Sequence, residues 1–238
     1  VDIVLPQGPK GDPGQADEEQ VHSLVQEYLA QNPDSGYLTQ ILPLKEFPDY
    51  KIVMTTGTYT GQENMQIDSD LLDEAIENQN QEPVFRLYAW KPRCISLGRN
   101  QKDDFLDYEF LKSKNIDVVK RLTGGRALLH DNEITYSYIC PISALKNGGN
   151  VTESYKEICQ YLINSFQKLG IELTLGNEKG IHTKFDYCML ISTGADVCYQ
   201  GKKIIGSAQY RKQGYILQHG GILFGYDKEL LESLFHEE

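Results

Sequence analysis

The stretch ADVCYQGKKIIG, residues 195–206, reads as two short strands joined by a tight turn. The Gln-Gly pair at 200–201 would form that turn, because glycine tolerates the backbone conformation that a two-residue turn requires. This register places Cys198 opposite Lys203, with both side chains on one face of the sheet. A lysine beside a thiol favours the reactive thiolate. Local geometry therefore nominates Cys198 and Lys203 as a nucleophile and its activator.

Cys188 is a second candidate nucleophile, in the loop-like stretch DYCMLISTG at residues 186–194. It would reach the face that carries the lysine only through the fold of the whole chain. The five cysteines are an odd number without a CxxC pair, which argues against a disulfide framework and a zinc site and favours a reducing cytoplasm. Cys94, Cys140 and Cys159 lie within apolar strand or helix patterns and are predicted to be core residues.

From residue 50 onward, strand-like and helix-like patterns indicate a mixed α and β domain. The longest predicted helix, 152–169, is preceded by a capping pair, Asn150 and Glu153, and is followed by Gly170. The other predicted helices are 65–78, with an apolar stripe of Met65, Leu71, Leu72, Ala75 and Ile76, and 102–115. The predicted strands are 51–57, 83–90, 93–98, 116–122 and 127–142.

Residues 1–49 are interpreted as a separate acidic extension, flexible or fused, ahead of a domain at 50–238. The extension holds the collagen-like triplets GPKGDPG and a predicted helix that ends at Pro33. The first 80 residues contain 15 Asp or Glu and 3 Lys or Arg, a net charge of −12, whereas the rest contain 19 and 20, a net charge of +1. This balance disfavours nucleic-acid binding and allows an acidic protein partner to dock on the second part. The sequence shows neither a membrane-spanning apolar run nor a signal-peptide pattern.

Two further stretches could carry chemistry. KRLTGGRALLHD, residues 120–131, surrounds a Gly-Gly pair with Lys120, Arg121 and Arg126, and its glycines would let the backbone approach a ligand closely. By itself this pattern fits an ordinary hairpin turn equally well. YAWKPRCISLGRNQ, residues 88–101, holds the single tryptophan beside a predicted turn and would alone indicate core packing plus a loop.

Four motifs in the same order are similar to those of a known family. They are NMQIDSDLL at 64–72, FRLYAWKPRCISLGRNQ at 85–101, KRLTGGRALLHDNEITYS at 120–137 and GKKIIGSAQYRKQGYILQHGGIL at 201–223. From about residue 50 to its end, the chain resembles the lipoate/octanoate protein ligase and transferase family, with its biotin/lipoate ligase-like catalytic domain. The resemblance is greatest to the octanoyltransferases that charge the glycine-cleavage H protein. It implies an α+β fold with mixed β-sheets flanked by helices and an acyl tunnel beside the Gly-Gly-Arg loop.

The resemblance also assigns residues. It implies that Cys188 forms an acyl-thioester and that Lys203 favours its thiolate, whereas Cys198 matches no functional position. For His130 and His219, the sequence is compatible with either a structural or a functional role. The substrate-binding residues that the resemblance implies are Arg121, Thr123, Gly124, Gly125, Arg126, His130, Gly206, Ser207 and Ala208.

The activity implied is transfer of an octanoyl group from octanoyl-acyl carrier protein to a lysine of a lipoyl-domain protein, such as the glycine-cleavage H protein, in lipoate biosynthesis. No cofactor or metal is implied, because the incoming thioester is already activated. The alternatives are an ATP-dependent lipoate-protein ligase and an inactive fusion or binding module. Arg126, where ligases carry a third glycine, and Ala195, where they carry asparagine, favour the transferase. The absence of Pro-Ser after Cys188, Gly221 at a usual serine position, and an early chain end leave a truncated, inactive protein as an expectation to test.

Overall fold

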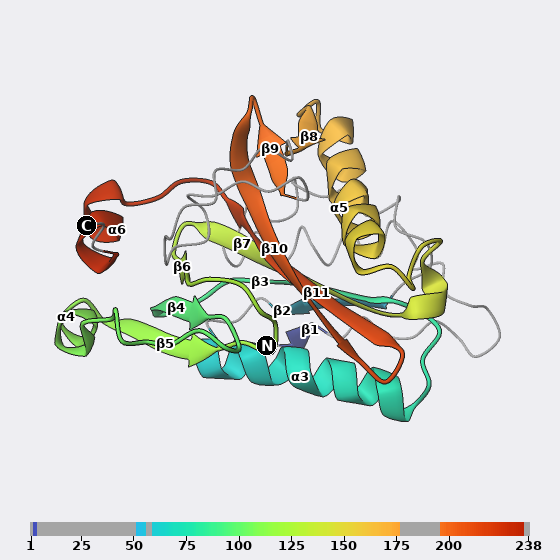
Figure 1. The fold of residues 1–238 in the computed structure, drawn as a ribbon, viewed down its shortest axis with the longest axis horizontal. Coiled ribbons are helices and arrows are strands. Elements are labelled where there is room, and N and C mark those ends of the chain that lie inside the picture. Colours follow the sequence, from blue (N-terminus) through green and yellow to red (C-terminus); the bar gives the residue numbers. More distant parts are fainter. Residues whose placement is uncertain (1, 4–50, 56–58, 177–195, 236–238) are drawn as a thin grey trace.

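The computed structural model describes residues 2–3, 51–55, 59–176 and 196–235 of the chain. Eight strands form one large sheet in the order β1-β2-β3-β7-β11-β10-β9-β8, in which β2 and β3 are parallel and the other neighbours are antiparallel (Figure 1). The strands are β1 (Asp2–Ile3), β2 (Lys51–Thr55), β3 (Val84–Tyr88), β7 (Glu133–Pro141), β8 (Leu173–Leu175), β9 (Val197–Tyr199), β10 (Lys202–Lys212) and β11 (Tyr215–Leu223).

A second sheet has three strands in the order β5-β4-β6, with β4 parallel to β5 and antiparallel to β6. Both sheets are therefore mixed, and the predicted α+β class is confirmed. The remaining elements are β4 (Arg93–Leu97), β5 (Ile116–Lys120), β6 (Leu128–His130), the helices α3 (Gly61–Glu77), α4 (Tyr108–Ser113), α5 (Val151–Lys168) and α6 (Lys228–Leu234), and the 3-10 turn η3 (Ile142–Ala144).

Two tight turns build the C-terminal half of the large sheet. Gln200 and Gly201 have φ values of 48° and 76°, and Lys203 pairs with Cys198, so the predicted hairpin and its register are confirmed. A second Gln-Gly pair, at 213–214 with φ values of 47° and 83°, joins β10 to β11. The same dipeptide thus marks both turns, and the second was not recognised in the sequence.

The two faces of the large sheet have separate cores. Along β7, Tyr136, Tyr138 and Cys140 pack with α5, whereas Ile139 packs in the cluster that contains Leu72 of α3. This alternation is expected because successive side chains of a strand point to opposite faces. Figure 1 shows α5 and α3 separated by the strands of the sheet. A third core, between the small sheet, α4 and α6, contains Ile95, Leu97, Leu111, Leu129, Leu230 and Leu234.

The predicted long helix is confirmed as α5, which the Asn150 side chain caps by accepting from the Glu153 N–H at 3.0 Å. Gly170, with φ 77°, follows its end. The predicted helix 102–115 was too long, because Asp107 caps a helix of only six residues, α4. The predicted strand 127–142 was also wrong as one element, since it breaks into β6 and β7.

The predicted stripe of α3 needs a correction. Leu72 and Ala75 are buried as expected, but Met65, Leu71 and Ile76 are only partly buried. The buried face includes Asn64 and Asp68 instead, so α3 presents polar side chains to the interior. The helix also begins at Gly61, four residues earlier than predicted, behind a capping box formed by Thr60 and Glu63.

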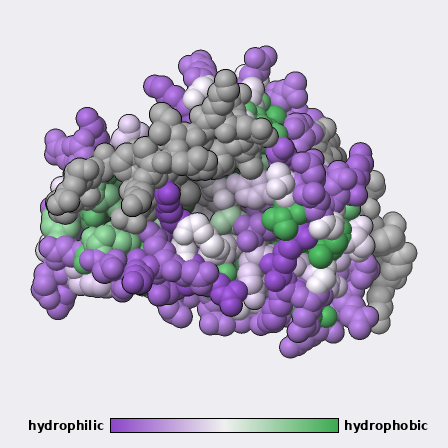
Figure 2. Space-filling model, in the orientation of Figure 1, coloured by the Kyte–Doolittle hydropathy of each residue, from purple (hydrophilic) through white to green (hydrophobic). Residues whose placement is uncertain are grey.

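Hydrophilic side chains cover most of the face seen in Figure 2, and hydrophobic ones show at the end that carries α4 and α6 and again in patches towards the opposite end. Within the described residues, none of the helices combines the length and the apolarity needed to cross a bilayer.

Candidate active site

A pocket opens between the large sheet, the small sheet and α3, beside the Gly-Gly-Arg loop. It contains about 450 Å³ of empty space including its mouth, and its accessible wall is mostly apolar. Its lining residues are Met65, Tyr88, Trp90, Ser96, Arg121, Gly125, Arg126, Leu128, His130, Thr135, Gly206, Ser207, Ala208, His219, Gly220 and Gly221. Of the catalytic and substrate-binding residues that the resemblance implies and the structure describes, Thr123, Gly124 and Lys203 are not among them.

Arg121 holds the loop at residues 121–126 in place. Its Nη2 donates to the carbonyl oxygens of Gly124 at 2.9 Å and Arg126 at 2.7 Å, and its Nε donates to Thr123 Oγ1 at 3.1 Å. Its Nη1 donates to the backbone oxygen and the hydroxyl of Ser96 at 2.7 and 3.1 Å. The rigid guanidinium fork thus joins the loop to β4, which indicates that Arg121 shapes the site from within.

The two glycines of the loop have different roles. Gly125 has φ 98°, a backbone conformation that favours glycine. Its carbonyl packs against Gly98 so closely that a Cβ on Gly98 would lie 1.9 Å from the Gly125 oxygen. A Cβ on Gly124 would meet no atom of the described residues within 4 Å, so packing among those residues does not explain this glycine. Gly124 leaves open space at the loop, as close approach of a ligand would require.

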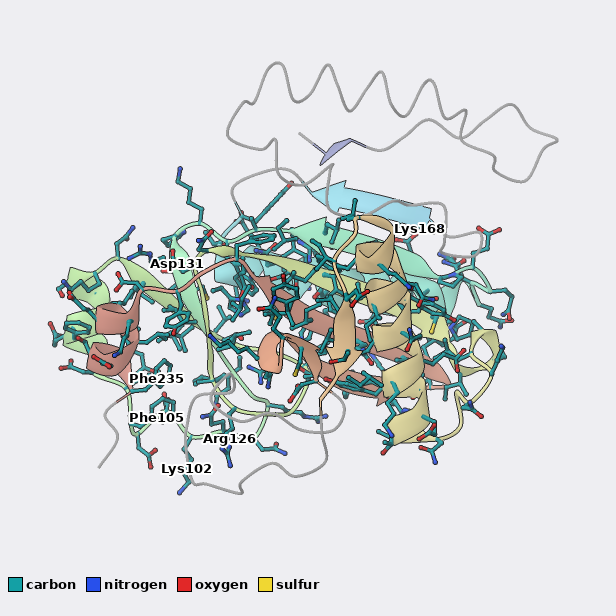
Figure 3. All side chains as sticks on the ribbon, turned by 90° about the horizontal axis from the view of Figure 1, so that it is seen from above. Lys102, Phe105, Arg126, Asp131, Lys168 and Phe235 are labelled. Atoms are coloured by element: carbon teal, nitrogen blue, oxygen red, sulfur yellow. The ribbon has the colours of Figure 1, made fainter. Side chains whose placement is uncertain are left out.

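Arg126, which lines the pocket, has a buried hydrogen-bond donor. Its Nη1 is buried, and the described part of the chain offers this atom no hydrogen-bond acceptor. Figure 3 shows Arg126 and Lys102 on the same side of the molecule, with Asp131 on the opposite side. A buried N–H without an acceptor is costly, so a ligand oxygen bound there would recover a lost hydrogen bond.

His219 belongs to a buried charge network under the pocket. Its Nε2 lies 2.7 Å from Thr123 Oγ1, and its Nδ1 lies 3.2 Å from Asp68 Oδ2. The other Asp68 oxygen accepts from Arg86 Nη1 at 2.7 Å, with both side chains almost fully buried. Burial would raise the pKa of Asp68, but the His219 hydrogen bond and the Arg86 charge outweigh it and hold that pKa below its usual value. Burial lowers the pKa of His219, which favours the neutral imidazole.

Arg86 and Tyr88 complete that network. The second guanidinium nitrogen of Arg86 donates to Asn64 Oδ1 at 2.6 Å, and the Tyr88 hydroxyl donates to Asp68 Oδ2 at 2.9 Å. Burial and the Asp68 charge raise the pKa of Tyr88 well above its usual value, so Tyr88 stays a hydrogen-bond donor. Asp68 thus receives a cation and several hydrogen bonds.

His130 forms a second histidine–carboxylate pair on the other side of the pocket. Its Nδ1 lies 2.6 Å from Glu133 Oε1, and its Nε2 lies 2.8 Å from Ser96 Oγ. The Trp90 ring stacks on the imidazole with centroids 3.8 Å apart, and its Nε1 donates to Thr135 Oγ1 at 2.7 Å. Glu133 Oε2 is buried, and no hydrogen-bond donor among the described residues reaches it.

Lys203 lies on the same face of β10 as the pocket residues Gly206 and Ala208. Val197 and Ile205, which are paired, belong to the α5 core, so Cys198 and Lys203 point to the opposite face. A β-bulge between Lys203 and Ile205 produces this change of face. Lys203 Nζ forms an ion pair with Asp196 Oδ2 at 3.1 Å, with both side chains 5% exposed.

The cysteines divide by environment. The predictions that Cys94, Cys140 and Cys159 are core residues are confirmed, and burial raises the pKa values of Cys140 and Cys159 to about 12. Buried thiols of this kind are inert as nucleophiles. Cys94, Cys140 and Cys159 are free thiols, and Cys198 is buried opposite Lys203. Cys188 lies outside the described residues.

Sequence reasoning missed the acids that orient both histidines. Asp68 is 151 residues from His219, and its only local signal is its four-residue spacing from Asn64 and Leu72 on one helical face. Glu133 lies three residues after His130, across the break between β6 and β7. The continuous strand predicted for 127–142 would have hidden that contact.

The sequence comparison identifies the family to which this catalytic domain belongs. A family model of the lipoyl protein ligase A/B catalytic domain matches residues 60–238. The chain therefore belongs to the lipoyl protein ligase A/B catalytic domain family.

Named relatives include two bacterial octanoyltransferases. The chain is 39% identical over 175 residues to octanoyltransferase LipM of Carboxydothermus hydrogenoformans, covering 73% of this chain and 65% of that protein. It is 40% identical over 183 residues to octanoyltransferase LipM of Geobacillus kaustophilus, covering 72% and 64%. The chain thus spans about two thirds of the length of these relatives.

Solved structures share the fold. An ATP-bound lipoate-protein ligase A superposes with a TM-score of 0.60 at 22% identity, covering 76% of this chain and 70% of that one. A bi-partite lipoate protein ligase of Thermoplasma acidophilum, studied with its E2 lipoyl domain, gives a TM-score of 0.57 at 22% identity, covering 77% and 66%. These similarities support the predicted biotin/lipoate ligase-like fold.

Proposed function

We propose that the chain is an octanoyltransferase that moves an octanoyl group from octanoyl-acyl carrier protein to a lysine of a lipoyl-domain protein through a thioester on Cys188. The mostly apolar pocket beside the Gly-Gly-Arg loop carries this proposal, because it offers an acyl chain an apolar wall next to buried polar atoms that have no partner among the described residues. Relatives named octanoyltransferase support the acyl group and the reaction class. The Thermoplasma ligase studied with a lipoyl domain supports the class of acceptor, and the glycine-cleavage H protein is our choice within it.

In the first step, the Cys188 thiolate attacks the carbonyl carbon of the donor thioester. A new C–S bond forms to Cys188, the bond to the carrier sulfur breaks, and the carrier leaves as a thiolate that takes up a proton. In our proposal Lys203, on the pocket face of β10, favours the Cys188 thiolate as a cation. Asp196 holds this lysine through the ion pair at 3.1 Å.

In the second step, the lysine amine of the acceptor attacks the octanoyl-enzyme. A C–N bond forms, the C–S bond to Cys188 breaks, and the thiolate returns. The Arg126 Nη1 donor can meet the acyl carbonyl oxygen, where negative charge develops in both steps. Each thioester is already activated, so the proposed pathway consumes no ATP.

Intact-protein mass spectrometry tests this function. The protein is incubated with octanoyl-acyl carrier protein, and a mass increase of one octanoyl group is expected that hydroxylamine removes, as it does for thioesters. Cys188→Ala should abolish the adduct, and Cys198→Ala is the matched control that should keep it. An adduct retained by Cys188→Ala and lost in Cys198→Ala would move the nucleophile to the hairpin cysteine.

A second arm separates the transferase from a ligase. Free octanoate and ATP replace the carrier thioester, and we expect neither an acyl-adenylate nor a modified acceptor. Arg126 and Ala195 stand where the family's ligases carry glycine and asparagine, which favours this outcome. Modification of the acceptor from free octanoate with ATP would establish the ligase instead.

A further inference from the structure

We propose that His130 takes up the proton that the acceptor amine loses when it attacks the octanoyl-enzyme, with the Ser96 hydroxyl as a relay and Glu133 as the positioning carboxylate. The inference rests on the proposed function, because it assigns the proton of its second step.

The chemistry requires a base in the pocket. A neutral amine that attacks a thioester carries an extra proton on nitrogen once the C–N bond has formed, and the thiolate of Cys188 leaves with its electron pair. A general base must lie within hydrogen-bond reach of that nitrogen, directly or through one bridging group. Of the described side chains that line the pocket, the imidazoles of His130 and His219 are the groups that accept a proton near neutral pH.

The contacts of His130 aim its basic nitrogen at the pocket. Glu133 Oε1, at 2.6 Å, accepts the Nδ1 proton, so the lone pair lies on Nε2. Ser96 Oγ, at 2.8 Å, donates to that lone pair and itself lines the pocket. The Trp90 ring, stacked at 3.8 Å, fixes the plane of the imidazole. Ser96, His130 and Glu133 are therefore hydrogen-bonded in sequence, as the serine, histidine and acid of catalytic triads are.

Ser96 can pass a proton without changing its position. Its oxygen accepts from Arg121 Nη1 at 3.1 Å and donates to His130, which leaves one lone pair for an incoming N–H. Transfer runs from the amine nitrogen to Ser96 Oγ while the Ser96 proton moves to His130 Nε2. The products are an amide, a Cys188 thiolate and an imidazolium beside the Glu133 carboxylate.

The charges around the two imidazoles favour His130 over His219. Asp68, behind His219, is already paired with the Arg86 guanidinium at 2.7 Å, and Thr123, on its Nε2, is fully buried and does not line the pocket. Glu133 accepts the hydrogen bond of neutral His130 at 2.6 Å, and no lysine or arginine among the described residues forms an ion pair with it. The other charged or titratable groups near His130 are Arg121, through Ser96, and His219, which interacts electrostatically with His130, whereas Arg93 and Asp131 form an exposed ion pair with each other.

The test separates the two half-reactions. Wild-type, His130→Gln and Glu133→Gln proteins are charged with octanoyl-acyl carrier protein, isolated as octanoyl-enzymes and mixed with a purified lipoyl-domain protein in single turnovers at a series of pH values. Glutamine fills the histidine site but accepts no proton, so transfer should slow about a hundredfold more than charging does. The wild-type transfer rate should fall at acid pH, and His130→Gln should lose that fall. Glu133→Gln should move it to lower pH.

Asp131→Asn is the matched control, because among the described residues the side chain of this neighbour of His130 pairs with exposed Arg93, at 2.8 Å. It should keep both rates and the pH profile. If His130→Gln does not fold, Ser96→Ala removes the relay while the Arg121 bond to the Ser96 carbonyl oxygen remains, and it should slow transfer selectively.

Equal slowing of charging and transfer, or a wild-type pH profile in His130→Gln, would overturn the proposal. Failure of the proposed function looks different, because the wild-type protein would then form no octanoyl-enzyme or would not pass its acyl group to the acceptor.

Discussion

The two histidines beside the pocket have the same local arrangement and different charges behind them. Each places Nδ1 on a buried carboxylate and Nε2 on a hydroxyl, with distances between 2.6 and 3.2 Å. Behind His219, Asp68 is neutralised by Arg86 and receives hydroxyl donors from Tyr88 and Ser137. Behind His130, one Glu133 oxygen accepts from His130 and Thr135, and the other lacks a described partner.

This difference in charge indicates that the two histidine–carboxylate clusters have different roles. A buried ion pair with satisfied hydrogen bonds costs much to break and changes little during a reaction. A buried carboxylate that is not already paired with a lysine or arginine stabilises positive charge when it appears on its histidine. We therefore expect the Asp68–His219 cluster to control stability and the Glu133–His130 cluster to control transfer.

The largest effect is expected from neutralising each acid in turn. Asp68→Asn leaves the fully buried Arg86 guanidinium without its counter-ion, so the free energy of unfolding should fall by about 3–5 kcal/mol. Glu133→Gln strands no cation and should cost about 1 kcal/mol or less. Urea unfolding followed by circular dichroism measures both. Equal losses in the two variants would show that the clusters do not differ in this way.

A double substitution tests whether Asp68 and Arg86 act as one unit. Arg86→Met leaves Asp68 unpaired, whereas Asp68→Asn with Arg86→Met removes both charges. The double variant should be more stable than the sum of the single losses predicts, by about 1–3 kcal/mol. Simple additivity in the same unfolding assay would contradict the pairing.

A smaller difference in stability is expected between variants of Tyr88 and Trp90, two aromatic residues that donate hydrogen bonds near the pocket. Tyr88→Phe removes the hydroxyl that donates to the Asp68 carboxylate at 2.9 Å and should cost about 1.5–3 kcal/mol, as bonds to charged groups do. Trp90→Phe removes an N–H donated to the neutral Thr135 hydroxyl at 2.7 Å and should cost about 0.5–1.5 kcal/mol. The reverse order in thermal unfolding would place the tighter network around His130.

The smallest effect is a slope of stability against pH. Because the folded pKa of His219 is lowered, the unfolded chain binds this proton first, below about pH 6.5. The contribution of His219 is therefore fully present above that pH and is lost as the pH falls towards the folded value. Wild-type stability should drop more steeply than that of His219→Gln over this window. Parallel curves would mean that His219 is not held neutral.

Much of the fold could be predicted because its signals are local. The Gln-Gly turn at 200–201 fixed the register of Cys198 with Lys203, and Asn150 with Gly170 bounded α5. These features depend on residues a few positions apart, whose backbone preferences are strong. The predicted apolar stripe of α3 was partly wrong, because apolar periodicity does not recognise a buried carboxylate such as Asp68.

The site was predicted less completely because its partners are distant in sequence. The Gly-Gly-Arg loop and His130 were found in one motif, but the bonds of Arg121 to Ser96 join residues 25 positions apart. The roles of Cys188 and Lys203 stay predictions, since they depend on the approach of a residue outside the described part of the chain to β10.

Transfer from the isolated octanoyl-enzyme tests the central claim most directly. The protein is charged with octanoyl-acyl carrier protein, freed of donor and nucleotide, and mixed with a lipoyl-domain protein, and both partners are followed by intact mass. We predict that the octanoyl mass leaves the enzyme and appears on the acceptor lysine in equal amount without ATP. An octanoyl group that stays on the enzyme, or an acceptor that gains it only from free octanoate and ATP, would contradict the account.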